Sequence, residues 1–406
     1  MSSPLRICVV GDLDGVHTHR WVRWFVDRGH ELHAVSYYQP RRPPPGVTVH
    51  ILAEGGGAAA LGGPGQAGPP AGRAGWRPVA RRLVEAVSPS LWRLVNGLRY
   101  RRRGLGTAID SVGPDVIHAH YVVEHGFYAA LAGRRPLVVT AWGSDVLVAP
   151  RRSPLSRAIA RYALRRADLV TSNNEYMARR LVELGAPPGR VALVVLGADA
   201  FFLEAPEASV NLQPAGETPP TVISVRSLDS RLYNVDVILR AMALVRKRVP
   251  DARLLVAGEG RLRAGLERLA HRLGIEGAVA FLGYLDREAL RDALASSHVY
   301  VSVPRSDGTA VSTLEAMAVG CFPIVSDLPS QEELVRDGEN GFRAPVGDGG
   351  ALAERIVEAL ARPNLRRQAL EPNRDLVKRK GLLEENMARM EELYRSLAGQ
   401  GGATSG

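Results

Sequence analysis

Short apolar runs alternate along the chain with longer segments in which apolar residues recur every three or four positions. The short runs are rich in β-branched residues and predict strands, whereas the longer segments predict amphipathic helices. In the first half, strands are expected at 5–11, 32–37, 47–52, 116–120, 137–142, 169–172 and 191–197, and helices at 19–27 and 153–166. This alternation predicts a parallel sheet covered by helices on both faces.

The pattern breaks at 206–220, where four prolines and little apolar periodicity predict a linker. A second alternating set follows it. Strands are expected at 221–225, 253–257, 279–283, 299–303, 322–326 and 342–345, and helices at 235–248, 261–273, 287–296, 313–318 and 350–361. Two α/β halves joined by a linker predict a cleft between them, with ligands at the carboxyl ends of the strands.

The length of 406 residues suits two domains. We expect Rossmann-like domains at 1–205 and 221–380, a final helix at 381–398 that packs back on the first domain, and a disordered tail at 399–406. The segment 54–75 is mostly Gly, Ala and Pro, and therefore predicts a mobile loop without a core of its own.

Composition excludes several classes of protein. Apolar residues make up 46% and charged residues 23%, as in globular domains, and the first apolar run ends at Gly11, too early for a signal peptide or a membrane span. Cys8 and Cys321 each lie within an apolar run, which indicates reduced core cysteines of a cytoplasmic protein.

The formal charge is +10, with arginine clusters at 77–103 and 151–166. One interpretation is a surface that attracts an anionic membrane or a phosphorylated acceptor, and the other is a solvated face. A nucleic-acid partner is not expected, because no recognised nucleic-acid module is present.

The most informative segment is 304–320, where a strand ends, a polar loop follows and a helix begins near Ser312. Amide groups at a helix start, together with the helix dipole, suit a diphosphate. The carboxylates of Asp307 and Glu315 would repel phosphate, so we expect them to accept hydrogen bonds from sugar hydroxyls. For Glu315 there is an alternative, because Ser312-x-x-Glu315 is also a capping box.

This segment resembles the donor motif of the retaining glycosyltransferases of family 4, which have the GT-B fold. That motif is an acidic residue, seven residues, then Glu followed by Ala-Met-Ala-x-Gly, and here Asp307, Glu315 and 316–320 match it. The resemblance implies that Glu315 binds the ribose of the donor nucleotide. It also implies that Asp307 and the loop around it meet the transferred sugar and the phosphates; the loop residues are Gly308, Thr309, Ala310, Val311 and Ser312. The first acid is usually Glu, and Asp is one methylene shorter.

Further segments resemble the family in the same order along nearly the whole chain: 14–17, 28–32, 114–120, 197–199 with Phe202, 258–260 and 281–283. The resemblance places Gly15 in the glycine loop of the first domain and Gly258 beside the nucleotide base. It implies that the first domain binds the acceptor and the second binds the nucleotide sugar.

Two positions depart from the family pattern. Arg226 matches the arginine near the diphosphate and can bind phosphate bidentately, but Tyr233 stands where a lysine is usual. Arg231 is either its substitute or a solvated loop arginine. Trp142 stands where a histidine beside the reacting sugar is usual, and tryptophan can stack on a sugar but cannot exchange a proton.

We expect the acceptor near Gly15, His17, His120, Trp142, Gly143 and Asp145. Gly15 is also expected to contact the donor, and His17 is expected either at the acceptor or at the donor phosphate. His118 and His120 alternate along a strand and point to one side of it; His118 is expected in the core and His120 nearer the site. Asp145 is either a polar group near the acceptor or a loop aspartate that caps backbone amides. Catalytic roles are expected for Asp307, Arg226, His120 and Asp145.

No cofactor and no metal are expected. Asp12-Leu13-Asp14 imitates a metal motif of the other large glycosyltransferase fold, but it lies in the first strand–helix turn. A dinucleotide is not expected either, because G-x-G-x-x-G is absent.

The sequence therefore predicts retaining transfer from a nucleoside-diphosphate sugar to a lipid-linked, glycan or small-molecule acceptor. The enzyme is expected to be a cytoplasmic hexosyltransferase that contacts the inner face of the cell membrane. Two alternatives stay open: a GT-B relative that acts as an epimerase or phosphorylase, and a catalytically silent binding subunit.

Overall fold

The computed structural model describes residues 3–36, 38–41, 43–52, 58–61, 104–204 and 218–402. The chain forms two compact units. Unit 1 comprises Met1–Asn173, Met177–Val194 and Met387–Gly406, and unit 2 comprises Asn174–Tyr176 and Val195–Asn386. Most of the expected linker, from 206 to 217, and most of the expected loop, from 62 to 75, lie outside the described residues.

Unit 1 is built on one sheet in the order β4-β3-β2-β1-β5-β6-β7-β8. Its strands are β1 (Arg6–Val10), β2 (Glu31–Ser36), β3 (Val47–Leu52), β4 (Ala58–Leu61), β5 (Val116–His120), β6 (Leu137–Thr140), β7 (Leu169–Ser172) and β8 (Val191–Leu193). All neighbouring strands pair in parallel except β3 and β4, which are antiparallel. The parallel sheet expected from the sequence is confirmed.

Strand β4 corrects the loop expected at 54–75. Its residues pair with Val49–Leu52 of β3 and so satisfy backbone groups that β3 would otherwise leave open at the sheet edge. A four-residue run without β-branched side chains carries little strand signal of its own, so the pairing with β3 decides its conformation.

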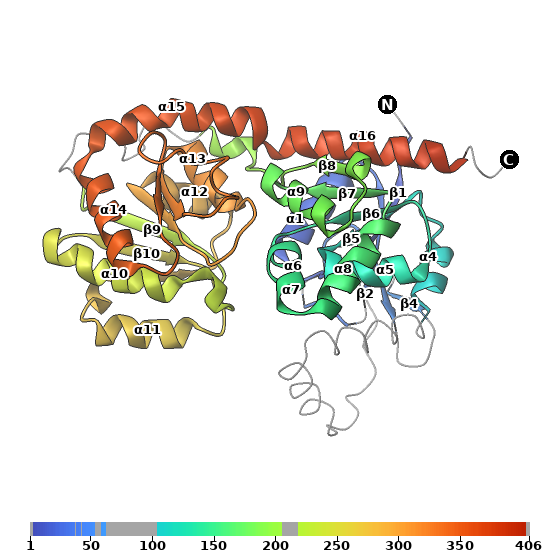
Figure 1. Ribbon diagram of the computed structural model, residues 1–406, viewed down its shortest axis with the longest axis horizontal. Helices are drawn as coiled ribbons and strands as arrows, with labels where there is room; N and C mark the ends of the chain where they lie inside the picture. Colours follow the sequence, from blue (N-terminus) through green and yellow to red (C-terminus); the bar gives the residue numbers. More distant parts are fainter. Residues whose placement is uncertain are drawn as a thin grey trace, which may run out of the picture. The chain divides into compact units, whose positions relative to one another are not determined.

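Helices cover the sheet of unit 1, and several are too short to show a periodic pattern in the sequence (Figure 1). They are α1 (Val16–Asp27), α4 (Leu105–Val112), the π-helical turn η1 (Tyr121–Gly126), α5 (Phe127–Ala132), α6 (Ser144–Leu147), α7 (Ala149–Arg152), α8 (Pro154–Arg166), α9 (Glu175–Leu184) and the 3-10 turn η2 (Pro188–Arg190). None of the described helices of the chain is long and apolar enough to cross a membrane.

The last helix, α16 (Leu383–Gly402), belongs to unit 1 from Met387 onward. The side chain of Tyr394 is fully buried, and its hydroxyl lies 2.5 Å from Nδ1 of His118 in β5 and accepts a hydrogen bond from Nε1 of Trp21 at 3.2 Å. The helix continues to Gly402, which corrects the tail expected at 399–406; residues 403–406 lie outside the described part.

Unit 2 is built on one fully parallel sheet, whose strands have the order β11-β10-β9-β12-β13-β14. The strands are β9 (Thr221–Val225), β10 (Arg253–Ala257), β11 (Val279–Gly283), β12 (Val299–Ser302), β13 (Phe322–Ser326) and β14 (Phe342–Ala344). The helices are α10 (Val235–Arg248), α11 (Arg263–Arg272), α12 (Arg287–Ala295), α13 (Val311–Val319), α14 (Gly349–Ala361) and α15 (Pro363–Lys380), with 3-10 turns η3 (Ala200–Phe202), η5 (Arg231–Tyr233) and η6 (Glu276–Ala278).

Two apolar clusters hold unit 2 together, one on each face of the sheet. One cluster packs α10, α11 and α14 against the strands, and the other packs α12 and α13 (Figure 1). Because both faces are covered, most of the strands appear as near-continuous apolar runs, which is why they could be predicted. The edge strand β11 is only partly buried.

The strand orders locate one candidate site in each unit. In unit 1, β1 lies between β2 and β5, and in unit 2, β9 lies between β10 and β12. At such a switch in strand order the connections leave toward opposite faces, so a crevice opens at the carboxyl ends of the strands. The loops after β1 and β5, and those after β9 and β12, are therefore the places to look for function.

Candidate functional site

In unit 2, Arg226 follows β9 directly and its guanidinium reaches the end of β12. Its Nε and Nη2 donate hydrogen bonds to Oγ of Ser302 at 2.8 and 2.5 Å, and Nη2 also forms an ion pair with the carboxylate of Asp307. The ring of Tyr233 lies 5.3 Å from the guanidinium carbon. The side chains of Arg226 and Asp307 are only 12% and 15% exposed. The fold thus brings together three residues that the sequence singled out separately.

The environment keeps Arg226 charged and Tyr233 neutral. Burial disfavours the charged guanidinium, but the carboxylate of Asp307 outweighs this effect and the pKa of Arg226 is raised. Burial raises the pKa of Tyr233, so its hydroxyl stays protonated at neutral pH. Tyr233 therefore does not restore the positive charge that a lysine would carry at its position.

The loop from Asp307 to Ala310 is fixed through its carbonyl groups. Ser330 donates a hydrogen bond from Oγ to the carbonyl of Asp307 at 2.7 Å, and Gln331 donates from Nε2 to the carbonyl of Gly308 at 2.6 Å. Helix α13 then begins at Val311, and Ala310 at its N-cap has no side-chain acceptor to offer the first amides. A rigid loop that ends in an uncapped helix start is suited to an anion.

The capping-box interpretation of Ser312 and Glu315 is wrong. Ser312 is the second residue of α13, not its N-cap, and its hydroxyl lies 2.8 Å from the hydroxyl of Tyr300 and donates to the carbonyl of Val225 at 3.3 Å. The hydroxyl faces the sheet because the helix begins before it. Glu315, which is 5% exposed, is therefore not held in place by a cap.

Gly258 shapes the site through its backbone. Its φ is +138°, and a Cβ at this position would lie 2.0 Å from the carbonyl oxygen of Arg226. The main chain after β10 can therefore approach Arg226 only without a side chain. Arg231, in contrast, is exposed and makes no ion pair with the residues that the structure describes.

In unit 1, an aromatic cluster gathers at the carboxyl ends of β1, β5 and β6. The rings of His17 and Trp142 are stacked, with centroids 4.9 Å apart and planes at 9°. The ring of His120 lies 5.5 Å from Trp142, and Trp21 meets both edge-on. Gly15 is the N-cap of α1 and leads into His17. The fold thus joins three of the predicted acceptor residues.

His120 is neutral and buried. Its Nδ1 lies 3.4 Å from Oγ1 of Thr18, and its Nε2 makes no hydrogen bond within the described part of the chain. Burial, and then the rings of His125 and His17, lower its pKa to about 3. A base with so low a pKa removes protons poorly at neutral pH, so this environment does not favour proton transfer as the catalytic role expected of His120.

Asp145 has a different role from the one predicted. Its side chain is fully buried, and its carboxylate accepts hydrogen bonds from the amides of Val122, Trp142 and Gly143 at 2.8, 3.1 and 2.9 Å. It therefore has no surface with which to touch an acceptor. Asp145 instead holds the main chain of Trp142 and Gly143, as the loop-aspartate alternative proposed.

The carboxylates of Asp12 and Asp14 are used within their own loop. Asp12 accepts hydrogen bonds from the hydroxyl of Tyr38 and from the amide of Asp14, and Asp14 accepts from the amide of Arg41 at 2.7 Å. Among the residues described by the structure, no group of three or more His, Cys, Asp or Glu is placed to hold a metal ion.

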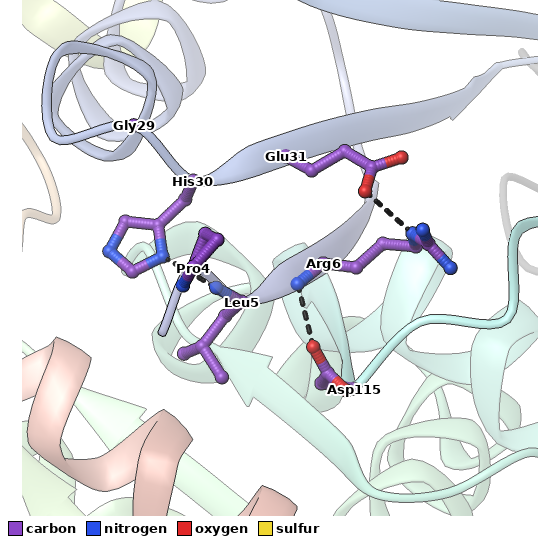
Figure 2. A pocket seen from close by; sticks show the side chains of 7 residues that line it. All are labelled: Pro4, Leu5, Arg6, Gly29, His30, Glu31 and Asp115. Carbon is purple, nitrogen blue, oxygen red and sulfur yellow. Dashed lines mark hydrogen bonds and ion pairs between the residues drawn. The ribbon is translucent and has the colours of Figure 1, made fainter. Parts of the chain in front are cut away.

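A hollow of about 430 Å³ lies at the other end of the unit 1 strands, beside the amino-terminal residues of β1, β2 and β5. Figure 2 shows that its polar groups are paired with each other: Leu5 donates its amide to Nδ1 of His30, and Arg6 donates its amide to Asp115 and its Nε to Glu31. Since these pairs satisfy one another, the hollow is not a candidate for either substrate.

Ser302 is a residue of the site that sequence reasoning missed. It lies at the end of β12, and it contacts Arg226 only because β12 is the neighbour of β9 in the sheet. A polar residue that ends a buried strand is the only signal the sequence offers for it.

The chain resembles known glycosyltransferases in sequence. Residues 208–375 match the family described as "Glycosyl transferases group 1", and residues 15–197 match "Glycosyl transferase 4-like domain". Over 287 residues the chain is 26% identical to N-acetyl-alpha-D-glucosaminyl L-malate synthase of Bacillus anthracis, which covers 69% of this chain and 74% of that protein.

A second relative is the GDP-mannose-dependent alpha-(1-6)-phosphatidylinositol monomannoside mannosyltransferase of Mycolicibacterium smegmatis. It is 27% identical over 253 residues, which cover 59% of this chain and 64% of that protein. The fold matches the crystal structure of Anabaena Alr3699/HepE in complex with UDP and glucose, with a TM-score of 0.70 over 97% of this chain and 100% of that chain at 17% identity.

Proposed function

Because the chain belongs to the group 1 glycosyltransferases and has their two-domain GT-B fold, we propose that it transfers a sugar from a nucleoside-diphosphate sugar to an acceptor with retention of configuration. The observation that carries the proposal is the cluster in unit 2, where Arg226, Asp307 and the uncapped start of α13 lie together at the switch in strand order. A cation, free helix amides and a carboxylate in one place suit a diphosphate that is joined to a sugar.

The proposed roles follow from the chemistry of each group. Arg226 and the first amides of α13 bind the diphosphate, and Asp307 accepts hydrogen bonds from hydroxyls of the transferred sugar. Glu315 accepts hydrogen bonds from the ribose hydroxyls. The UDP and glucose bound to Alr3699/HepE support a nucleotide-sugar donor, and the GDP-mannose-dependent relative makes guanine the other base to test.

Retention is proposed to proceed without a protein base. The acceptor oxygen bonds to the anomeric carbon on the face from which the diphosphate leaves, and a phosphate oxygen of the leaving group takes the acceptor proton. Two observations support this route: the side chain of Trp142 cannot act as an acid or a base near neutral pH, and the pKa of His120 is lowered to about 3.

The acceptor is proposed to bind in unit 1. The stacked pair of His17 and Trp142 offers an aromatic surface for a sugar ring or another flat group. A separate hollow of about 420 Å³ between α7, α8 and α9 contains Arg151, Arg152 and Arg157. None of the three forms an ion pair with a described residue, so a lipid-linked or phosphorylated acceptor at the cytoplasmic membrane face is the class we propose.

We propose that sugar transfer does not require a divalent metal ion. The Asp12 and Asp14 carboxylates already accept hydrogen bonds inside their loop, so a divalent ion would have to displace the hydroxyl of Tyr38 and the amide of Arg41. Transfer is therefore expected to continue in excess EDTA.

The experiment begins with thermal shift of the pure chain with UDP, GDP and their sugar conjugates. The stabilising donor is then incubated with candidate acceptors, and products are identified by mass and by the anomeric coupling constant in NMR. A glycosylated acceptor of retained configuration is expected. Stabilisation by none of these nucleotides would overturn the proposal, and a phosphorolysed or epimerised donor would replace transfer by the corresponding reaction.

A further inference from the structure

The charge balance of the proposed donor site calls for a second cation. Arg226 is already paired with Asp307, so the two side chains together carry no net charge, and Glu315 on α13 adds a carboxylate. A diphosphate that enters a partly buried site without compensating charge pays a large desolvation penalty. Arg226 alone, shared with a carboxylate, does not balance it.

The loop after β12 contains an arginine, Arg305, that is anchored to the residues on either side of Tyr233. Arg305 donates its amide to the carbonyl of Leu232 at 2.8 Å, and its Nε to Oδ1 of Asn234 at 2.9 Å. Leu232 and Asn234 flank Tyr233, whose ring contacts Arg226. Arg305 is therefore tied on both sides of the position where the resemblance led us to expect a lysine.

The side chain of Asn234 fixes the position of Arg305. It is fully buried and has a φ of +52°, a left-handed conformation that is uncommon outside glycine. Its Nδ2 donates to the carbonyl of Val303 at 2.9 Å while its Oδ1 accepts from Arg305. Although it is the N-cap of α10, its side chain forms no capping hydrogen bond. The side chain instead joins the loops after β9 and β12 and orients Arg305.

The remaining guanidinium nitrogens of Arg305, Nη1 and Nη2, make no hydrogen bond or ion pair within the ranges that the structure describes. A guanidinium held by its Nε and open at both Nη groups is preorganised for bidentate contact with phosphate. Arg305 and Arg231 are both exposed, but Arg231, which the sequence offered as the substitute, has no such anchor among the described residues. Ordering the side chain of Arg231 would therefore cost more conformational entropy.

From this geometry we propose that Arg305 is the second cation of the diphosphate site, in place of the lysine that Tyr233 replaces. The proposal rests on the proposed function and names a residue within the same site. Arg305 contacts the β-phosphate side of the nucleotide, so its contribution is to diphosphate binding and not to binding of the nucleoside.

The experiment measures, by isothermal titration on the full chain, the dissociation constants of UDP and UMP, and of GDP and GMP. The ratio of monophosphate to diphosphate dissociation constants isolates the contribution of the second phosphate. Arg305→Gln removes the charge but keeps an amide donor for Asn234, and Arg231→Gln is the matched control two residues before Tyr233. Losing a charge-assisted contact is expected to lower the ratio in Arg305→Gln by about tenfold or more, with no change in Arg231→Gln.

Two further variants test the proposal, and the first of them does so even if Arg305→Gln does not fold. Arg305→Lys retains the positive charge but not the two Nη groups that can bind a phosphate together. Its ratio of monophosphate to diphosphate dissociation constants is therefore expected to fall only a few-fold. Tyr233→Lys added to Arg305→Gln returns a cation at the neighbouring position and is expected to recover most of the ratio.

The outcomes separate this proposal from the one it rests on. Failure of the wild-type chain to bind either diphosphate overturns the proposed function and the role of Arg305 together. Tight diphosphate binding that is equally strong in Arg305→Gln and Arg231→Gln leaves the function standing and overturns the role of Arg305. A loss confined to Arg231→Gln assigns the second charge to Arg231 instead.

Discussion

Arg226 and Asp307 form an ion pair within unit 2 across 81 positions of sequence. The pair joins the end of β9 to the loop after β12, and each side chain is largely buried. Removing one partner would leave a partly buried charge without compensation, which is destabilising. A diphosphate and a sugar can take over these two partners, because one offers anionic oxygens and the other hydroxyl donors.

The pair predicts opposite effects of its two neutral variants on nucleotide binding. Arg226→Gln removes a phosphate ligand and is expected to weaken binding of the nucleoside diphosphate by about 10- to 100-fold. Asp307→Asn releases Arg226 and is expected to tighten binding a few-fold while it lowers kcat, because its contact with the transferred sugar is lost. Titration calorimetry and initial rates test both, and weaker diphosphate binding by Asp307→Asn contradicts the assignment.

Glu315 is predicted to accept hydrogen bonds from the ribose hydroxyls of the nucleotide. The wild-type chain is expected to bind UDP or GDP more tightly than the 2′- and 3′-deoxy analogues, since a hydrogen bond to a charged group contributes about 1.5–3 kcal/mol. In Glu315→Gln this preference is expected to shrink by about tenfold. Glu371→Gln, an exposed acid on α15, is the control. A preference that persists in Glu315→Gln excludes the ribose contact.

Tyr394 is predicted to stabilise the fold of unit 1. Tyr394→Phe leaves Nδ1 of His118 and Nε1 of Trp21 without their shared partner in the core, and is expected to lower the free energy of unfolding by about 1–3 kcal/mol. Tyr284→Phe, at a residue that is 62% exposed, should change it little. Urea denaturation followed by circular dichroism provides the comparison, and equal midpoints for the two variants contradict the buried link.

The histidines of β5 predict how stability changes with pH. Burial lowers the pKa of His118 well below its ordinary value of 6.5, and that of His120 to about 3, so both are neutral in the folded chain. The unfolded chain binds protons at these residues below pH 6.5, so their contribution to stability is present above that pH and lost as the pH falls toward 3.

His120→Gln removes one of these two groups. Between pH 7 and pH 5 the wild-type chain is expected to lose about 2 kcal/mol more unfolding free energy than this variant, from linkage at a single residue. His271→Gln, at an exposed position of α11, is the control and should follow the wild type. Parallel pH profiles for the wild type and His120→Gln would contradict the burial of a neutral ring.

Much of the fold could be predicted because most of its strands are buried on both faces and therefore appear as apolar runs. The strands 221–225 and 253–257, and the helix 235–248, have the predicted bounds. The short helices α4 to α7 could not be found, because four to eight residues show too few repeats of a helical pattern. Strand β4 depends on its pairing with β3 and not on its own residues.

The candidate site, like the fold, could be predicted from the sequence only in part. The order of short motifs identified the family, and the segment 304–320 pointed to a helix start that suits a diphosphate. Two roles stayed open for Asp145, because a sequence does not show whether a carboxylate points outward or toward backbone amides. The capping box at Ser312 was equally indistinguishable from a serine that faces the sheet.

By itself the sequence determined the family, the two α/β halves and the segments that carry the acids and Arg226, because these depend on the types of neighbouring residues and on their periodicity. The tertiary structure decided which distant groups meet: Arg226 with Ser302 and Asp307, Tyr394 with His118, and Arg305 with Asn234. Strand order places these side chains together, and strand order arises from packing over long separations along the chain, which no local pattern records.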